Sequence, residues 1–62
     1  MKQIDLMRAL YHGYNGDRDR CIEEFAAAGE RGEVPRVSNK DGGSARRYAR
    51  ALYKNYLRKG LF

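Results

Sequence analysis

Residues 44–62 read SARRYARALYKNYLRKGLF and carry one uninterrupted helical pattern. Ser44 is a good N-cap, because its hydroxyl can accept a hydrogen bond from the unpaired amides of a first helical turn. Gly60 suits the position after the last turn, since glycine enters the left-handed conformation without a Cβ penalty. These two signals predict a helix over about 45–59.

This predicted helix has two opposed faces at about 100° per residue. Its apolar face consists of Ala45, Tyr48, Ala49, Leu52 and Tyr56. The opposite face carries a cationic arc of about 120°. The cationic arc consists of Arg46, Arg47, Arg50, Lys54 and Arg58. Beyond the glycine, Leu61 is expected to pack back on Tyr56 and fasten the chain end.

Two further helices are predicted upstream, because apolar residues recur there at three- and four-residue steps. The first spans about 2–12 and ends in a turn with two glycines and an asparagine. The second spans about 18–31, with Asp17 as its N-cap and Gly32 just beyond its end. Cys21 lies on the apolar side of this second helix and is interpreted as a small buried hydrophobe.

These elements predict an all-α fold, a compact three-helix domain over residues 1–62. The first two helices form an αα-hairpin, and the basic C-terminal helix packs across it. Residues 33–43 form a connecting loop that is long for a small bundle. The fold is helix-turn-helix-like at most, because that motif has a turn of about three or four residues. Residues 50–62 resemble the third helix and the following Gly-Leu-hydrophobic step of winged-helix domains, although nothing follows Phe62 to build a wing.

A chain of 62 residues can bury only a small core. One cysteine and one histidine are too few for an intramolecular disulfide or a structural zinc site, so no metal or cofactor is expected. Helix packing or self-association, such as a homodimer, must then supply the stability. The lone cysteine and the absence of a signal peptide or bilayer-spanning run predict a cytoplasmic protein with no membrane partner. Met1 and the capped last helix predict a complete small protein.

Charge is distributed unevenly along the chain, whose formal net charge is +5. Residues 1–32 carry five basic and six acidic side chains, a net charge of −1. Residues 33–62 carry eight basic and two acidic side chains, a net charge of +6. Such asymmetry is typical of a chain that meets a polyanion.

The cationic arc predicts a small nucleic-acid-binding protein, with DNA favoured over RNA. Four of its five cations are arginines, whose planar fork suits phosphate or guanine. Tyr53 lies at the margin of the arc and is expected either to stack on a base or to pack into the core. A phosphate cup formed by Gly42, Gly43 and the amides after Ser44 is a weaker hypothesis. The predicted nucleic-acid-binding residues are Arg36, Lys40, Arg46, Arg47, Arg50, Tyr53, Lys54 and Arg58.

The alternative is a small protein-binding regulator, such as a phage-like inhibitor, that docks on an acidic protein surface. A helix that perturbs membranes is less favoured, because the apolar side of the last helix is needed for the core. Enzymatic activity is not predicted. His12 and Cys21 lack a residue to orient them as a nucleophilic pair, and three short helices rarely form an active-site pocket.

Overall fold

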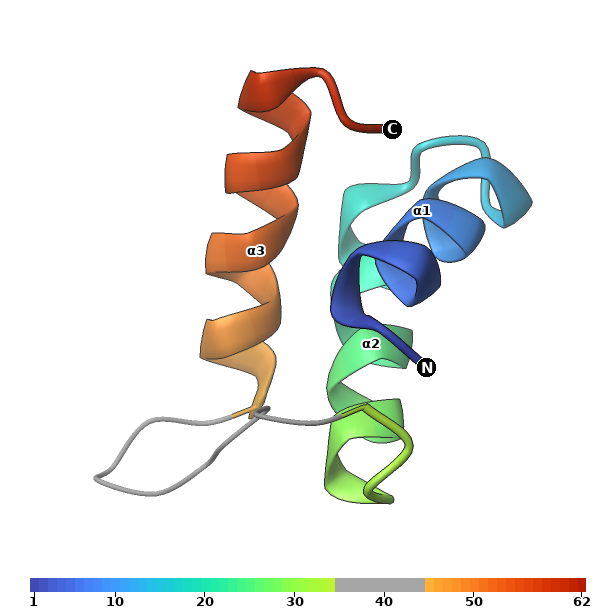
Figure 1. Cartoon of the computed structure of the whole chain (residues 1–62), viewed down its shortest axis with the longest axis vertical. Coiled ribbons are helices and arrows are strands. Elements are labelled where there is room, and N and C mark those ends of the chain that lie inside the picture. Colours follow the sequence, from blue (N-terminus) through green and yellow to red (C-terminus); the bar gives the residue numbers. More distant parts are fainter. Residues whose placement is uncertain (35–44) are drawn as a thin grey trace.

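The computed structural model describes residues 1–34 and 45–62, which form three α-helices and contain no strand. Helix α1 spans Gln3–Gly13, α2 spans Arg18–Glu30 and α3 spans Ala45–Lys59 (Figure 1). The predicted all-α three-helix fold is confirmed. The bounds of α3 are as predicted, α1 begins and ends one residue later, and α2 ends one residue earlier.

Local signals in the sequence set the helix ends. The Asp17 carboxylate accepts a hydrogen bond of 3.2 Å from the Arg20 amide, which confirms the predicted N-cap of α2. Gly32 and Gly60 follow α2 and α3 with φ angles of 78° and 68°, a left-handed conformation that side chains other than glycine rarely adopt. The predicted Ser44 cap lies outside the described residues.

Helix α2 is the central element of the fold. Helix α3 runs antiparallel along α2, while α1 crosses the N-terminal part of α2 at an angle (Figure 1). Four residues, 14–17, connect α1 to α2, whereas the connection from α2 to α3 spans residues 31–44. The second connection is much longer than the turn of a helix-turn-helix motif. Helix α3 is therefore positioned by packing on α2 and not by a tight turn.

The core forms where the three helices meet. Its largest fully buried side chains are Phe25, Met7 and Cys21, so the predicted burial of the lone cysteine is confirmed. Helix α3 contributes the small side chains of Ala45 and Ala49, which let its backbone come close to α2. Close backbone approach and dense helix packing are one way in which such a short chain gains stability.

The buried face of α3 is turned relative to the predicted one. The fully buried positions of α3 include Tyr53, whereas Tyr48 and Tyr56, predicted to be core residues, are only partly buried. The Tyr48 hydroxyl donates a hydrogen bond of 3.1 Å to the side-chain oxygen of Gln3 in α1. The difference arises because α2 packs against the side of α3 that carries Tyr53.

Phe62 holds the chain end against the core. Its ring stacks on Tyr11, with centroids 4.2 Å apart, and also lies against Tyr53 and Tyr56 at 5.4 and 6.2 Å. Leu61, expected to fill this role, is 38% exposed. Its amide does donate to the Tyr56 carbonyl at 3.0 Å, which closes the last turn and turns the following residue inward.

Candidate nucleic-acid interface

The cationic arc lies on the side of α3 that the core leaves exposed. All five of its side chains are exposed, while Ala45 and Ala49 on the other side are buried. Four of the five recur at four-residue steps, so neighbours in the row are about 6 Å apart along the helix axis. This row consists of Arg46, Arg50, Lys54 and Arg58. Each four-residue step also turns the chain by about 40° around the helix, so the row crosses the arc obliquely from Arg46 to Arg58.

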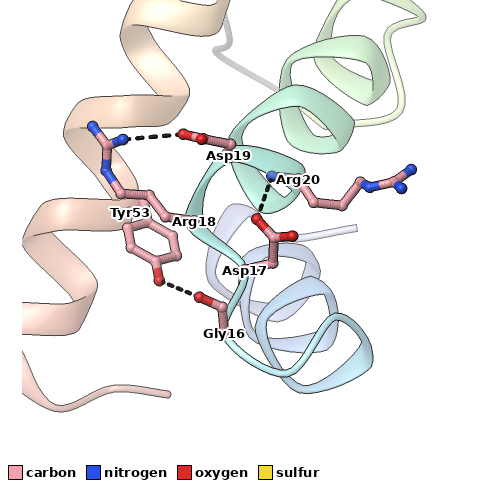
Figure 2. A network of polar contacts seen from close by, with 6 residues as sticks. All are labelled: Gly16, Asp17, Arg18, Asp19, Arg20 and Tyr53. Carbon is pink, nitrogen blue, oxygen red and sulfur yellow. Dashed lines mark hydrogen bonds and ion pairs between the residues drawn. The ribbon is translucent and has the colours of Figure 1, made fainter.

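The side of the arc nearest α2, which we call the α2 edge, has mixed charge. A groove of about 140 Å³ there is lined by Arg18, Asp19, Ile22, Glu23, Arg46 and Arg50. Arg46 Nη2 lies 3.4 Å from Glu23 Oε1. Arg18 Nη1 lies 3.1 Å from Asp19 Oδ1, and Figure 2 shows the Arg18 side chain extending from the start of α2 towards α3. Two acidic side chains of α2 thus face the arginines of α3.

The opposite side of the arc, which we call the outer edge, includes Arg47 and Arg58. Helix α3 contains no acidic residue, so the helix itself adds no negative charge to the outer edge. Arg58 donates a hydrogen bond of 3.1 Å to the side-chain oxygen of Asn55, a neutral group that does not compensate the charge of the arginine. Arg50 and Lys54, nearer the middle, form no ion pair with a carboxylate of residues 1–34 or 45–62.

Tyr53 does not belong to this interface. Its side chain is 4% exposed, and its hydroxyl donates a hydrogen bond of 3.1 Å to the Gly16 carbonyl (Figure 2). The rings of Tyr11 and Phe62 lie against it, with centroids 6.1 and 5.4 Å away. A base cannot reach a ring that is covered in this way. The predicted stacking role of Tyr53 is therefore wrong, and its alternative, packing into the core, is confirmed.

The structure also adds one cation to the interface and leaves two untested. Arg18 lines the same groove as Arg46, although its place on α2 gave no sign of this in the sequence. Its position depends on how α2 and α3 pack, which helical periodicity does not encode. Arg36 and Lys40, predicted to add phosphate contacts, lie outside the described residues, as does the phosphate cup at residues 42–44.

A second groove follows the outer edge and has a more apolar floor. It measures about 450 Å³ and is lined by Tyr48, Ala51, Leu52, Lys54, Asn55 and Arg58. Leu57, on the arc side of α3, is 49% exposed. Apolar surface next to cations is more typical of protein–protein interfaces than of surfaces that bind only phosphate.

The residues considered for chemistry lie apart from the arc. Cys21 is fully buried, and its pKa is raised by burial and, to a lesser extent, by the charge of Asp17. A thiol in that state is a poor nucleophile, because the thiolate is the reactive form. Within residues 1–34 and 45–62, no group of three or more His, Cys, Asp and Glu side chains is arranged to hold a metal ion.

Fold and surface together define a small three-helix protein with one strongly cationic helix face. None of its described helices is long and apolar enough to cross a membrane. No protein-family model, curated protein or solved structure matches the chain. Its function is therefore inferred from the charge and packing of the described residues.

Proposed function

We propose that this protein binds nucleic acid through the cationic arc of α3. The observation that carries the proposal is the row of exposed cations on a helix that has no acidic residue. Lysine and arginine side chains that neutralise phosphates supply most of the sequence-independent affinity of nucleic-acid-binding proteins. Arginine adds a fork of donors that contacts a phosphate with two hydrogen bonds at once.

The spacing of the row supports a backbone ligand. Successive cations are about 6 Å apart along α3, and one strand of a duplex carries a phosphate about every 3.4 Å of helix axis. The spacing between neighbouring cations is thus comparable with the axial rise of two phosphates, so neighbouring cations can contact different phosphates. The opposite face of α3 is anchored in the core by Ala45, Ala49 and Tyr53, so little order has to be gained on binding.

Fluorescence anisotropy with short labelled duplex DNA, duplex RNA and single strands tests the proposal. Four phosphate contacts on a duplex give a slope of about −3.6 for log K against log salt, a loss on the order of 100-fold between about 50 and 200 mM. The same assay compares DNA with RNA, for which the sequence predicts a preference for DNA. Affinity that does not change with salt would contradict the proposal.

Two double variants distinguish binding by the cations of the arc from binding by net positive charge alone. Arg50→Ala/Lys54→Ala removes two cations from the middle of the arc, and Lys2→Ala/Lys59→Ala removes two exposed cations from outside it. Alanine favours helix at positions 50, 54 and 59, and Lys2 precedes α1 without a side-chain capping hydrogen bond, so both variants should fold. We expect the arc variant to lose at least about tenfold in affinity and to reduce the salt slope by about 1.8. Equal losses in the two variants would show that only net charge matters.

The second candidate function is docking on an acidic protein surface. It is favoured by the exposed side chain of Leu57 and by the groove of about 450 Å³ on α3, because both add apolar contact area next to cations. A protein-binding regulator of this kind should form a complex that Leu57→Ala and Lys54→Ala both weaken. It should have negligible affinity for every nucleic acid at about 50 mM salt, where phosphate-driven binding is strong.

A further inference from the structure

The two edges of the cationic arc differ in charge. On the α2 edge, Asp19 and Glu23 line one groove with Arg46 and Arg50. The acidic side chains are 90% and 66% exposed, so they face the same solvent as the arginines. At the outer edge, α3 itself contributes no acidic residue. Among the residues that the structure describes, a polyanion that approaches α3 therefore meets mixed charge at the α2 edge and the cations of α3 at the outer edge.

We infer, on the basis of the proposed nucleic-acid binding, that Asp19 and Glu23 confine the cationic arc to a single phosphodiester strand. Helix α3 then lies along a nucleic-acid backbone and does not enter the major groove. The ligand class is a phosphodiester strand, in a duplex or on its own, bound without preference for base sequence.

The dimensions of the major groove give the first reason. The groove is about 12 Å wide in B-DNA, and an α-helix with its side chains is about 10–12 Å across. A helix that enters the groove therefore presents both flanks to walls lined with phosphates. One flank of α3 is occupied by α2, whose Asp19 and Glu23 border the arc. Carboxylates placed against phosphates oppose this docking geometry by like-charge repulsion.

The ion pair between Arg46 and Glu23 gives the second reason. Arg46 Nη2 is 3.4 Å from Glu23 Oε1, and both side chains are more than half exposed. Exposed pairs of this kind are weak, so a phosphate can compete for Arg46, but only beside the charge of Glu23. Arg46 should then add less to binding than Arg50, which has no carboxylate partner among the described residues.

The decisive comparison is between Glu23→Gln and Glu24→Gln. Both variants remove one negative charge from α2 and keep the size of the side chain, but only Glu23 lines the groove beside Arg46. Affinity is measured by anisotropy for labelled duplex DNA and for its separated strands, at several salt concentrations between about 50 and 200 mM. Circular dichroism of each variant checks that the helices are retained.

We expect Glu23→Gln to bind both forms of DNA about fivefold more tightly at the lowest salt, because a unit charge about 4 Å from a phosphate changes affinity by that factor in water. Its salt slope on duplex DNA should become steeper by up to about 0.9, since Arg46 then contacts a phosphate without competition from Glu23. Glu24→Gln should stay within about twofold of the parent protein, because salt screens charges that lie further away.

A second arm of the experiment compares duplexes of equal length and unrelated sequence. Binding along one backbone strand predicts affinities within about threefold of one another, since phosphate contacts carry no sequence information. A preference of more than about 100-fold for one duplex, with no binding to single strands, would show that α3 reads base edges in a groove. That result would overturn the single-strand inference and leave nucleic-acid binding intact.

The remaining outcomes separate the inference from the proposed function. If the parent protein binds with a steep salt dependence but Glu23→Gln and Glu24→Gln behave alike, nucleic-acid binding stands and the role of Glu23 is overturned. If the parent protein binds no nucleic acid at about 50 mM salt, where phosphate contacts are strong, the proposed function fails and the single-strand inference fails with it.

Discussion

The hydroxyl of Tyr53 joins α3 to the turn between α1 and α2. It donates to the Gly16 carbonyl at 3.1 Å, and the ring is buried against Tyr11 and Phe62. The accepting carbonyl immediately precedes Asp17, the N-cap of α2. One side chain thus fixes the rotation of α3 relative to the start of α2, and with it the position of the cationic arc beside the acidic residues of α2.

Tyr53→Phe should lower the free energy of unfolding by about 1 kcal/mol, because one intramolecular hydrogen bond is lost while the shape of the ring is kept. Urea denaturation measures the change. Tyr14→Phe is the control, since that side chain is 38% exposed and its hydroxyl has no such link to α3; its effect should stay within about 0.5 kcal/mol. Weaker nucleic-acid binding by Tyr53→Phe at unchanged stability would mean that the tyrosine contacts the ligand after all.

At the scale of the helix, the end of α3 is held by the two residues beyond its glycine cap. The ring of Phe62 stacks on Tyr11 of α1, and Arg8 of α1 donates a hydrogen bond of 2.9 Å to the Leu61 carbonyl. These contacts tie α3 to α1, with which it otherwise packs less extensively than with α2. The last two residues therefore connect the end of α3 to α1.

Phe62→Ala should cost about 2 kcal/mol of stability. The estimate is below the 3–5 kcal/mol typical of a fully buried phenylalanine, because this ring is only partly buried. Leu61→Ala is the matched control, with an expected cost below about 1 kcal/mol because its side chain is 38% exposed. Urea denaturation of both variants gives the comparison. A larger loss for Leu61→Ala would restore the role that the sequence assigned to the leucine.

At the scale of the whole molecule, burial couples stability to alkaline pH. Burial raises the pKa of the Cys21 thiol and of the Tyr53 and Tyr56 hydroxyls. Most neighbouring titratable groups act in the same direction, whereas the charge of Arg18 lowers the pKa of Tyr53. The native protein therefore holds these protons more tightly than the unfolded chain does. The stability that these three protonated groups contribute is fully present below about pH 8.5, the pKa of the thiol in the unfolded chain. It is lost as pH rises through the raised pKa values of the three groups in the native protein.

The free energy of unfolding should accordingly fall as pH rises above about 8.5, first through the thiol and then, above about pH 10, through the tyrosines. Urea denaturation at a series of pH values measures this decline. In Cys21→Ala the decline should begin later, near the tyrosine pKa of about 10. If the parent protein and Cys21→Ala follow the same curve, the buried thiol does not contribute.

Self-association and a cytoplasmic location stay predictions.

The sequence alone determined the helices and the cationic arc. Capping by Asp17, glycines at the positions after α2 and α3, and the 3.6-residue period act within one helix, so they can be read from neighbouring residues. The composition of the arc follows from the same period. These features needed no knowledge of which helix packs against which.

Tertiary structure decided everything that depends on the contact between helices. Tyr53 lies at the margin of both faces of α3, so only the rotation of α3 against α2 could place its ring in the core. The pairing of Arg46 with Glu23 joins residues that are 23 positions apart, and the stacking of Phe62 on Tyr11 joins the last residue of the sequence to α1. Helical periodicity describes each helix in isolation and says nothing about its neighbours, which is why these contacts, and the unequal edges of the arc, could not be predicted.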